Sequence, residues 1–343
     1  MPYTVKSSEA KVQSGTDAET KALLYMMGER ADSDEIDLFV VDFFNDLTGA
    51  TRYFEKLWDV QSKANLRCSK EVGRALVTLL KNYNSEFKFD FYILCTGSVP
   101  KSLLKNPEKK TFGIEDIAKA KSVASIKEGL RQECDKKGYT KEQNITDEII
   151  EEFLKKVSFI IVDKPAHEYV KSVIKNYPKV IPQDEDILRS IFHEICKEQA
   201  AKKHSEVENI QIQDPDQALY YHRHLTVNEI KLLILQRIIG ADPLQSGRPR
   251  SFDKIYAKSS SNEKFDALEG CQRDVCRVLF DRANSSAFWR LFENIHELIV
   301  ANPNWDVEDV FRNLDREVRD AVPHFISYSL KYFIALVKDS IDK

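Results

Sequence analysis

The chain has 343 residues, of which 42% are hydrophobic and 31% are charged. This length predicts about two domains. The 51 basic and 55 acidic residues give a formal net charge of −4, so a general attraction to nucleic acid is excluded and such contact needs a local basic surface. Gly and Pro number only 11 each, which excludes collagen-like chains and long low-complexity linkers.

The N-terminal region predicts an arm followed by a helix. Residues 1–16 are polar and contain no apolar stretch like that of a signal peptide, so we expect a flexible arm and a cytoplasmic protein. No apolar run approaches the ~20 residues that a membrane-spanning helix needs. Residues 18–30 favour an amphipathic helix that ends near Gly28.

The six cysteines include no C-x-x-C pair, which favours reduced thiols over a disulfide framework or a zinc site.

An α/β pattern follows the first helix. Residues 36–44 and 87–95 are rich in β-branched and aromatic side chains and predict strands, and residues 56–62 predict another strand by their alternation. A turn is expected over residues 45–49, because they include Asn, Asp, Thr and Gly. A helix is expected over residues 69–83, where apolar side chains recur at helical spacing.

The rest of the chain predicts a basic insertion and then a helical part. Residues 101–145 hold 11 basic and 7 acidic residues and are interpreted as an insertion. A helix capped at Asn144 or Thr146, a strand at 157–162 and a helix at 184–203 then complete the α/β part. The pattern from residue 205 onward is all-α, with helices expected after a capping box at Thr226 and around 265–281, 286–300, 306–321 and 324–341. The expected organisation is an arm (1–16), an α/β domain (17–204) and a helical oligomerisation or partner-docking domain (205–343).

The strongest functional signal lies in residues 31–63. Residues 31–47 hold six acidic residues and no basic one. The next strand presents Asp59, Gln61 and Lys63 on one face, because alternate residues of a strand share a face. Carboxylates, a carboxamide oxygen and a lysine on one surface are what metal-dependent phosphodiester hydrolysis requires, since oxygen ligands hold Mg²⁺ and a lysine orients water or balances charge. The alternative is that these are ordinary charged residues at strand ends.

Other chemistries are disfavoured. The sequence contains no Walker-type G-x-x-x-x-G-K-[ST] loop, no G-x-G-x-x-G fingerprint and no G-x-S-x-G elbow. His222 and His224 form the only close histidine pair in the sequence. No carboxylate or Cys accompanies them at ligand spacing, so a polar surface stretch is favoured there over a metal site.

Residues 15–100 resemble the PD-(D/E)xK, restriction-endonuclease-like nucleases. They are similar to the branch whose third element is Q-x-K, which includes the dsDNA endonuclease domain of CD-NTase-associated antiphage effectors and nuclease domains found beside HerA-type ATPases. The matching elements are Glu19 in the first helix, Asp46 in the FFND segment and Gln61-Ser-Lys63 at the end of a strand. The resemblance implies an α/β (α+β) restriction-endonuclease-like core followed by an all-α C-terminal domain.

The same resemblance implies a metal-dependent DNA endonuclease, an effector in bacterial antiphage defence. Asp46, Gln61, Lys63 and Glu19 would be its catalytic residues. Of these, Asp46, Gln61 and Glu19 would hold Mg²⁺ or Mn²⁺. Gln61 stands where an acidic residue is commoner, which removes one negative charge from the metal.

Two further acidic residues compete as ligands, Asp42 and Asp59. Asp42 and Asp46 lie roughly 13 Å apart along an extended strand, so they cannot share one ion unless the strand bends. Asp46 is preferred because the turn places it nearer to Gln61 and Lys63.

The expected partners are double-stranded DNA, further copies of the chain and a HerA-type ring ATPase, with no membrane. A homo-oligomer is expected because cutting both strands needs two active sites. Phosphate contacts are expected from the basic residues of segment 101–141 and from Arg248, Arg250, Lys254 and Lys258. The alternative function is a catalytically inactive nuclease-fold adaptor that binds DNA or a partner ATPase.

Overall fold

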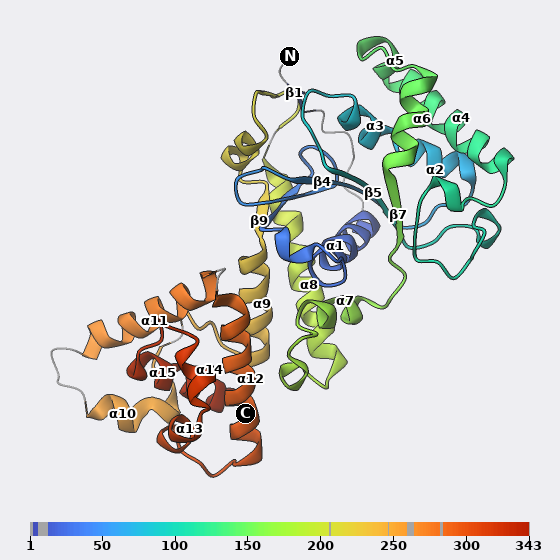
Figure 1. Cartoon of the computed structure of the whole chain (residues 1–343). Helices are drawn as coiled ribbons and strands as arrows, with labels where there is room; N and C mark the ends of the chain where they lie inside the picture. Colours follow the sequence, from blue (N-terminus) through green and yellow to red (C-terminus); the bar gives the residue numbers. More distant parts are fainter. Residues whose placement is uncertain are drawn as a thin grey trace. The chain divides into compact units, whose positions relative to one another are not determined.

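The computed structural model describes residues 3–5, 13–205, 207–245, 247–258, 264–281 and 284–342, and it divides into two units (Figure 1). Unit 1 comprises residues 1–173 and 192–227, and unit 2 comprises residues 174–191 and 228–343. Unit 1 combines helices with a sheet, whereas unit 2 is helical in its described part. The predicted mixed α/β class with a helical C-terminal region is therefore confirmed.

The main sheet of unit 1 has the strand order β6-β7-β5-β4-β3-β2-β9. Strands β2, β3 and β4 form an antiparallel meander, and β5 and β7 run parallel to β4. A second, small sheet pairs β1 with β8. The strands are β1 Tyr3–Thr4, β2 Leu38–Val41, β3 Leu47–Ala50, β4 Leu57–Lys63, β5 Phe91–Thr96, β6 Thr111–Phe112, β7 Val157–Ile161, β8 Gln211–Ile212 and β9 His224–Thr226.

Helices supply the crossovers that parallel strands require. Two helices, α2 and α3, connect β4 to β5, and α4, α5 and α6 lie between β5 and β7 in the chain. The helices that belong wholly or partly to unit 1 are α1 Gln13–Gly28, α2 Ser69–Ala75, α3 Val77–Tyr83, α4 Ala120–Lys137, α5 Tyr139–Glu142, α6 Asp147–Lys156, α7 Ala166–Val173 and α8 Glu185–Ala201.

The two faces of β4 are covered by different helices. Trp58 on one face donates from Nε1 to Asp32, just beyond α1, at 3.0 Å. Asp59 on the other face accepts a hydrogen bond from Nδ2 of Asn82 in α3 at 2.8 Å. Both α1 and α3 pack against β4, and Figure 1 shows α1 running beside the sheet. Strand alternation therefore places Asp59, Gln61 and Lys63 on the face that α3 covers.

Three local predictions are wrong. The single helix expected around residues 306–321 is divided into α13 Val307–Asn313 and α14 Arg316–Asp320, because Leu314 is extended. Thr48 and Gly49, expected in a turn, belong to β3, because the turn closes earlier, where the Asp42 N–H donates to the Asp46 carbonyl at 3.0 Å. The single helix expected over residues 69–83 is broken at Leu76, whose N–H donates three residues back to Gly73 at 3.1 Å. The break lets α2 pack against α4 while α3 reaches the sheet.

The N-terminal arm and the basic insertion are both tied to unit 1. Tyr3 and Val5 are buried, and β1 pairs with β8, so this described part of the arm is packed. The 101–145 segment supplies β6 at the sheet edge and α4 against α2. Residues 205–227 also belong to unit 1, because β9 pairs with β2, whereas residues 174–191 belong to unit 2. These unit limits differ from the expected division at residue 205.

Unit 2 is built around aromatic side chains. Phe288, Phe292 and Phe333 are buried, and the ring centroids of Phe288 and Phe292 lie 5.4 and 6.0 Å from that of Phe333. Leu330 and the run from Tyr332 to Val337 are also buried, so α15 is the core helix of this unit. The helices are α9 Val227–Ile239, α10 Asp253–Ala257, α11 Lys264–Phe280, α12 Ser285–Ala301, α13 Val307–Asn313, α14 Arg316–Asp320 and α15 Ser327–Ile341.

Two glycines allow α2 and α4 to cross closely. A Cβ on Gly73 would lie 2.0 Å from the Ile126 carbonyl oxygen, and a Cβ on Gly129 would lie 2.2 Å from the Lys70 carbonyl oxygen. Both obstacles are backbone atoms, so a side chain at either position would push the helices apart.

Gly129→Ala is therefore expected to lower the free energy of unfolding by about 1–3 kcal/mol, the usual cost of overpacking. Gly270→Ala in α11 is the matched control, because the nearest atom to its added Cβ is Arg273 Nη2 at 4.0 Å. That change should stabilise the helix by roughly 0.5–1 kcal/mol. Urea denaturation midpoints measure both effects, and equal stabilisation by the two changes would contradict the close crossing.

Candidate active site

The start of β3 and the end of β4 bring Asp46 and Gln61 together. The antiparallel register pairs Leu47 with Val60, so the next pair outward is Asp46 opposite Gln61. Asp46 Oδ2 accepts a hydrogen bond from Gln61 Nε2 and a second one from the Ser62 N–H at 2.8 Å. Asp46 is half-buried and Gln61 is only 4% exposed. The predicted proximity of these two side chains is present in the structure.

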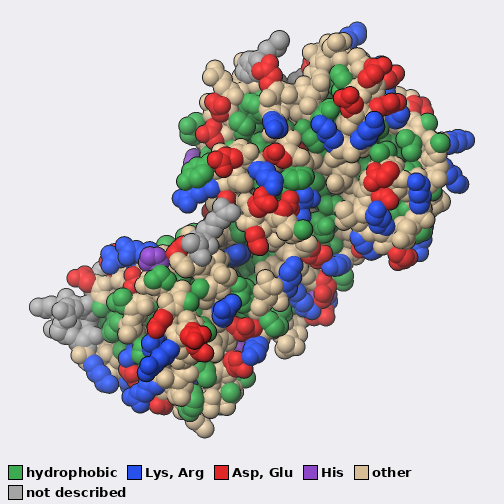
Figure 2. All heavy atoms as spheres, viewed as in Figure 1, with side chains coloured by type: hydrophobic (Ala, Val, Ile, Leu, Met, Phe, Trp, Pro, Cys, Tyr) green, Lys and Arg blue, Asp and Glu red, His purple; other side chains and the backbone are tan. Residues whose placement is uncertain are grey.

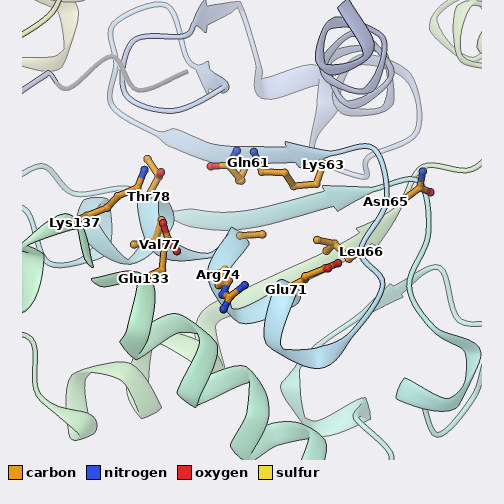
Figure 3. A pocket seen from close by; sticks show the side chains of 11 residues that line it. Gln61, Lys63, Asn65, Leu66, Glu71, Arg74, Val77, Thr78, Glu133 and Lys137 are labelled. Atoms are coloured by element: carbon orange, nitrogen blue, oxygen red, sulfur yellow. The ribbon is translucent and has the colours of Figure 1, made fainter. Parts of the chain in front are cut away.

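Gln61 and Lys63 border one cavity (Figure 3). They share a face of β4, and the opposite side of the cavity is formed by side chains from α2, α3 and α4. The cavity has a volume of about 330 Å³ and is open to solvent. Its lining residues are Gln61, Lys63, Asn65, Leu66, Glu71, Arg74, Ala75, Val77, Thr78, Glu133 and Lys137.

Glu19 is engaged in an ion pair. Its carboxylate lies 2.5 Å from Lys203 Nζ, and both side chains are largely buried, at 12% and 17% exposure. Lys203 follows α8, so the pair connects α1 to the end of that helix. The assignment of Glu19 to the metal site stays a prediction.

Asp42 has a structural partner. The backbone of Asp42 adopts a left-handed conformation with φ +47°, which the sequence pattern did not indicate. The carboxylate lies 3.0 Å from Nη1 of Arg223, and the Arg223 guanidinium also donates to the carbonyls of Asp42, Lys203 and Ser205. Arg223 is 4% exposed. The ion pair with this buried guanidinium gives Asp42 a structural role, which is to stabilise the β2–β3 turn. Asp46 is therefore the better candidate of the two as a metal ligand.

Asp59 lies at the centre of a buried hydrogen-bond network. It accepts from Asn45 Nδ2 at 2.9 Å and from Asn82 Nδ2 at 2.8 Å, and it is fully buried. Burial raises the pKa of Asp59 to about 7, although the two amides and the charge of Lys81 favour the ionised form. Asn45 also accepts from the Asp46 N–H at 3.0 Å. Asp59 therefore supports the backbone of Asp46, and its carboxylate is occupied within the protein.

The donors at this site suit a magnesium ion in part. Asp46 supplies a carboxylate, and Gln61 supplies a carboxamide oxygen once its amide group is turned from the orientation in which Nε2 donates to Asp46. No group of three His, Cys, Asp or Glu side chains that could hold a metal occurs among the described residues, His222 and His224 included. Mg²⁺ commonly keeps several waters and binds through one or two carboxylates plus substrate phosphate, so this small donor set is compatible with it.

The basic segments predicted to contact DNA are placed in different units. In segment 101–145, several lysines are already paired with acids, such as Lys109 with Asp116 at 2.7 Å and Lys127 with Glu151 at 2.5 Å. Figure 2 likewise shows basic and acidic side chains interspersed on the visible face. The other four predicted contacts are exposed but belong to unit 2, and Arg248 pairs with Asp253 at 2.6 Å; they are Arg248, Arg250, Lys254 and Lys258.

Sequence reasoning missed Arg74, Asn45 and Asn82 as site residues, and it named Lys137 only among the basic residues of segment 101–141. Arg74 and Lys137 line the cavity from helices that the sequence does not connect to Gln61. Asn45 and Asn82 are buried polar residues whose partner is Asp59. An Asn on the apolar face of a predicted helix was the one available signal, because a buried amide needs a partner.

Among the helices that the structure describes, none is both long and apolar enough to cross a membrane. All six cysteines are free thiols, as predicted. The chain matches no family model, and no curated protein or solved structure shows significant similarity to it.

Proposed function

We propose that this chain is a Mg²⁺- or Mn²⁺-dependent nuclease that hydrolyses phosphodiester bonds in DNA. The observation that carries the proposal is the contact of Asp46 with Gln61 across two antiparallel strands, with Lys63 on the same face at the rim of a cavity. The element order also supports it. A helix, an antiparallel meander of three strands, a helical crossover and a parallel strand follow one another, as expected for a restriction-endonuclease-like core.

In this function Asp46 and Gln61 would hold the metal ion. When bound, the ion would polarise the scissile phosphate and lower the pKa of an attacking water. The Lys63 ammonium would orient that water or balance the charge of the transition state. The Ser62 N–H and Gln61 keep the Asp46 carboxylate in place before any ligand arrives.

A catalytically inactive nuclease-fold adaptor is the second candidate. It is favoured by the small donor set of the described residues and by the ion pair that engages Glu19 with Lys203. In either case the role in antiphage defence and the HerA-type ATPase partner rest on the family resemblance. The homo-oligomer rests on the need for two active sites to cut both DNA strands.

The test is cleavage of supercoiled plasmid by the purified chain with Mg²⁺, Mn²⁺ or EDTA. We expect cleavage with either metal and none with EDTA.

Gln61→Glu adds a charged ligand, so it should reduce the Mg²⁺ concentration needed for half-maximal cleavage. The maximal rate should fall, because the longer-range charge of the new carboxylate would displace the water that Lys63 is proposed to orient. Gln61→Leu should abolish cleavage at every metal concentration. Cleavage that is equal with EDTA and Mg²⁺, or unaffected by Gln61→Leu, would contradict this site.

A further inference from the structure

The cavity beside Gln61 and Lys63 contains cations that the proposed hydrolysis does not use. Arg74 extends from α2 and Lys137 from the last turn of α4, and both side chains line the cavity across from Gln61 and Lys63 (Figure 3). Neither forms an ion pair with a carboxylate of the described residues. A volume of about 330 Å³ is at the lower end of small-molecule sites, which span roughly 300–1,000 Å³. The cavity therefore suits a single nucleotide unit better than a base pair.

The two acids of the cavity are engaged locally. Glu71 Oε2 accepts the Arg67 N–H at 2.7 Å, which caps the start of α2. Glu133 lies 3.5 Å from Lys136 Nζ, one turn along the same helix. Thr78 contributes a hydroxyl that can donate to a phosphate oxygen. The cations Lys63, Arg74 and Lys137 thus outnumber the acids, and they come from three different elements around one opening.

We propose that this cavity binds the phosphate of the nucleotide adjoining the scissile bond, with Arg74 and Lys137 as its cationic contacts. This inference rests on the proposed nuclease function. It follows from adjacency, because Gln61 and Lys63 belong both to the candidate active site and to the cavity wall. A strand whose scissile phosphate lies at Asp46 has its neighbouring phosphate close by along the backbone. An arginine fork and an ammonium are the side chains that recognise such a phosphate.

The experiment measures DNA affinity of the full chain without cleavage. Fluorescence anisotropy with a labelled single-stranded oligonucleotide in EDTA compares the unmodified chain, Arg74→Gln/Lys137→Gln and the control Lys155→Gln. Glutamine keeps much of the side-chain length, and thermal unfolding of each variant checks that it is folded. Lys155 is the matched control because it is an exposed lysine of α6 that lies outside both the cavity and the 101–141 segment.

We expect the double variant to bind about tenfold or more weakly, since a decrease of ~1.4 kcal/mol in binding free energy is tenfold in affinity. A plot of the logarithm of the association constant against the logarithm of the salt concentration should also have a shallower slope for the double variant. The slope should change by about 0.7 for each phosphate that the variant no longer neutralises. Lys155→Gln should bind like the unmodified chain. Glu133→Gln should bind more tightly, because it removes a negative charge from the cavity. Equal affinity and equal salt slope for the double variant and the unmodified chain would overturn the proposal.

Competition distinguishes the two sources of such a phosphate. If a nucleoside 5′-monophosphate displaces the DNA from the unmodified chain but not from the double variant, the cavity accepts a free nucleotide phosphate. If it does not compete while the variant still binds DNA more weakly, the ligand is the backbone of a strand. Both results support a phosphate site. Cleavage by the unmodified chain with unchanged binding by the variant would refute only the cavity, whereas weakened binding without any cleavage would refute only the nuclease.

Discussion

Lys63→Ala is expected to reduce Mg²⁺-dependent DNA cleavage by at least about 100-fold, the loss typical when one stabilising donor is removed from an active site. Lys63 ends β4, is half-buried and faces the same cavity as Gln61. Alanine removes the charge that would orient water or stabilise the pentavalent phosphate. The measurement is the initial rate of plasmid nicking with purified protein, compared with Lys88→Ala, a change at an exposed lysine before β5.

Lys63→Ala that cleaves at the unmodified rate would exclude this lysine from the chemistry and favour the adaptor.

Asp46→Ala should abolish cleavage as well, and its effect on stability is informative. Clustered carboxylates alone would predict stabilisation when one is removed. The structure predicts the opposite, because Asp46 accepts hydrogen bonds from the Ser62 N–H and Gln61. We expect a loss of about 1–3 kcal/mol in the free energy of unfolding, since alanine leaves these donors unpaired.

The strands that sequence analysis predicted well are those whose own residue pattern favours a strand; burial does not distinguish them, because the missed strand β3 is buried at every position. The β-branched and aromatic runs around β2, β5 and β7, and the alternation in β4, need no tertiary information to be identified. Strand β3 was missed because its sequence, Leu-Thr-Gly-Ala, has the composition of a turn. Its conformation depends on pairing with β2 on one side and β4 on the other. Such pairing is a long-range property that local propensity does not contain.

In the candidate site, too, the features that depend on local sequence were predicted and those that depend on distant residues were not. Gln61 and Lys63 follow from strand alternation, and Asp46 follows from a turn placed before the next strand. The partners of the neighbouring acids lie far away in sequence, with Asn82 23 residues from Asp59 and Arg223 181 residues from Asp42. No periodic pattern connects residues at such separations. Sequence analysis could therefore name Asp42 and Asp59 as alternates but could not assign them structural partners.

Asp59 is expected to make the protein less stable as the pH rises from about 4 to about 7. Burial raises its pKa from 3.8 to about 7 in the folded chain. Between these values the folded chain holds a proton that the unfolded chain has released, so the free energy of unfolding falls with increasing pH. The full effect is on the order of 4 kcal/mol, because each pKa unit corresponds to ~1.4 kcal/mol.

Asp59→Asn removes this titration. The stability of the variant relative to the unmodified chain should therefore rise between pH 5 and pH 8, which urea denaturation midpoints at the two pH values measure. A pH-independent loss is expected on top, because asparagine replaces one of the two Asp59 oxygens that accept from Asn45 and Asn82 with an NH2 donor. A stability difference that is the same at pH 5 and pH 8 would show that Asp59 does not titrate in this range.

Asp59→Leu separates titration from hydrogen bonding. Leucine also removes the ionisable group, but it leaves the amide donors of Asn45 and Asn82 without their acceptor, at a cost of about 1–3 kcal/mol each. We therefore expect a large loss of stability at both pH values, whereas the asparagine variant loses less. Because Asn45 also accepts the Asp46 N–H, faster hydrogen exchange around Asp46 should accompany the leucine change. Equal stability of the two variants would mean that the network contributes only through charge.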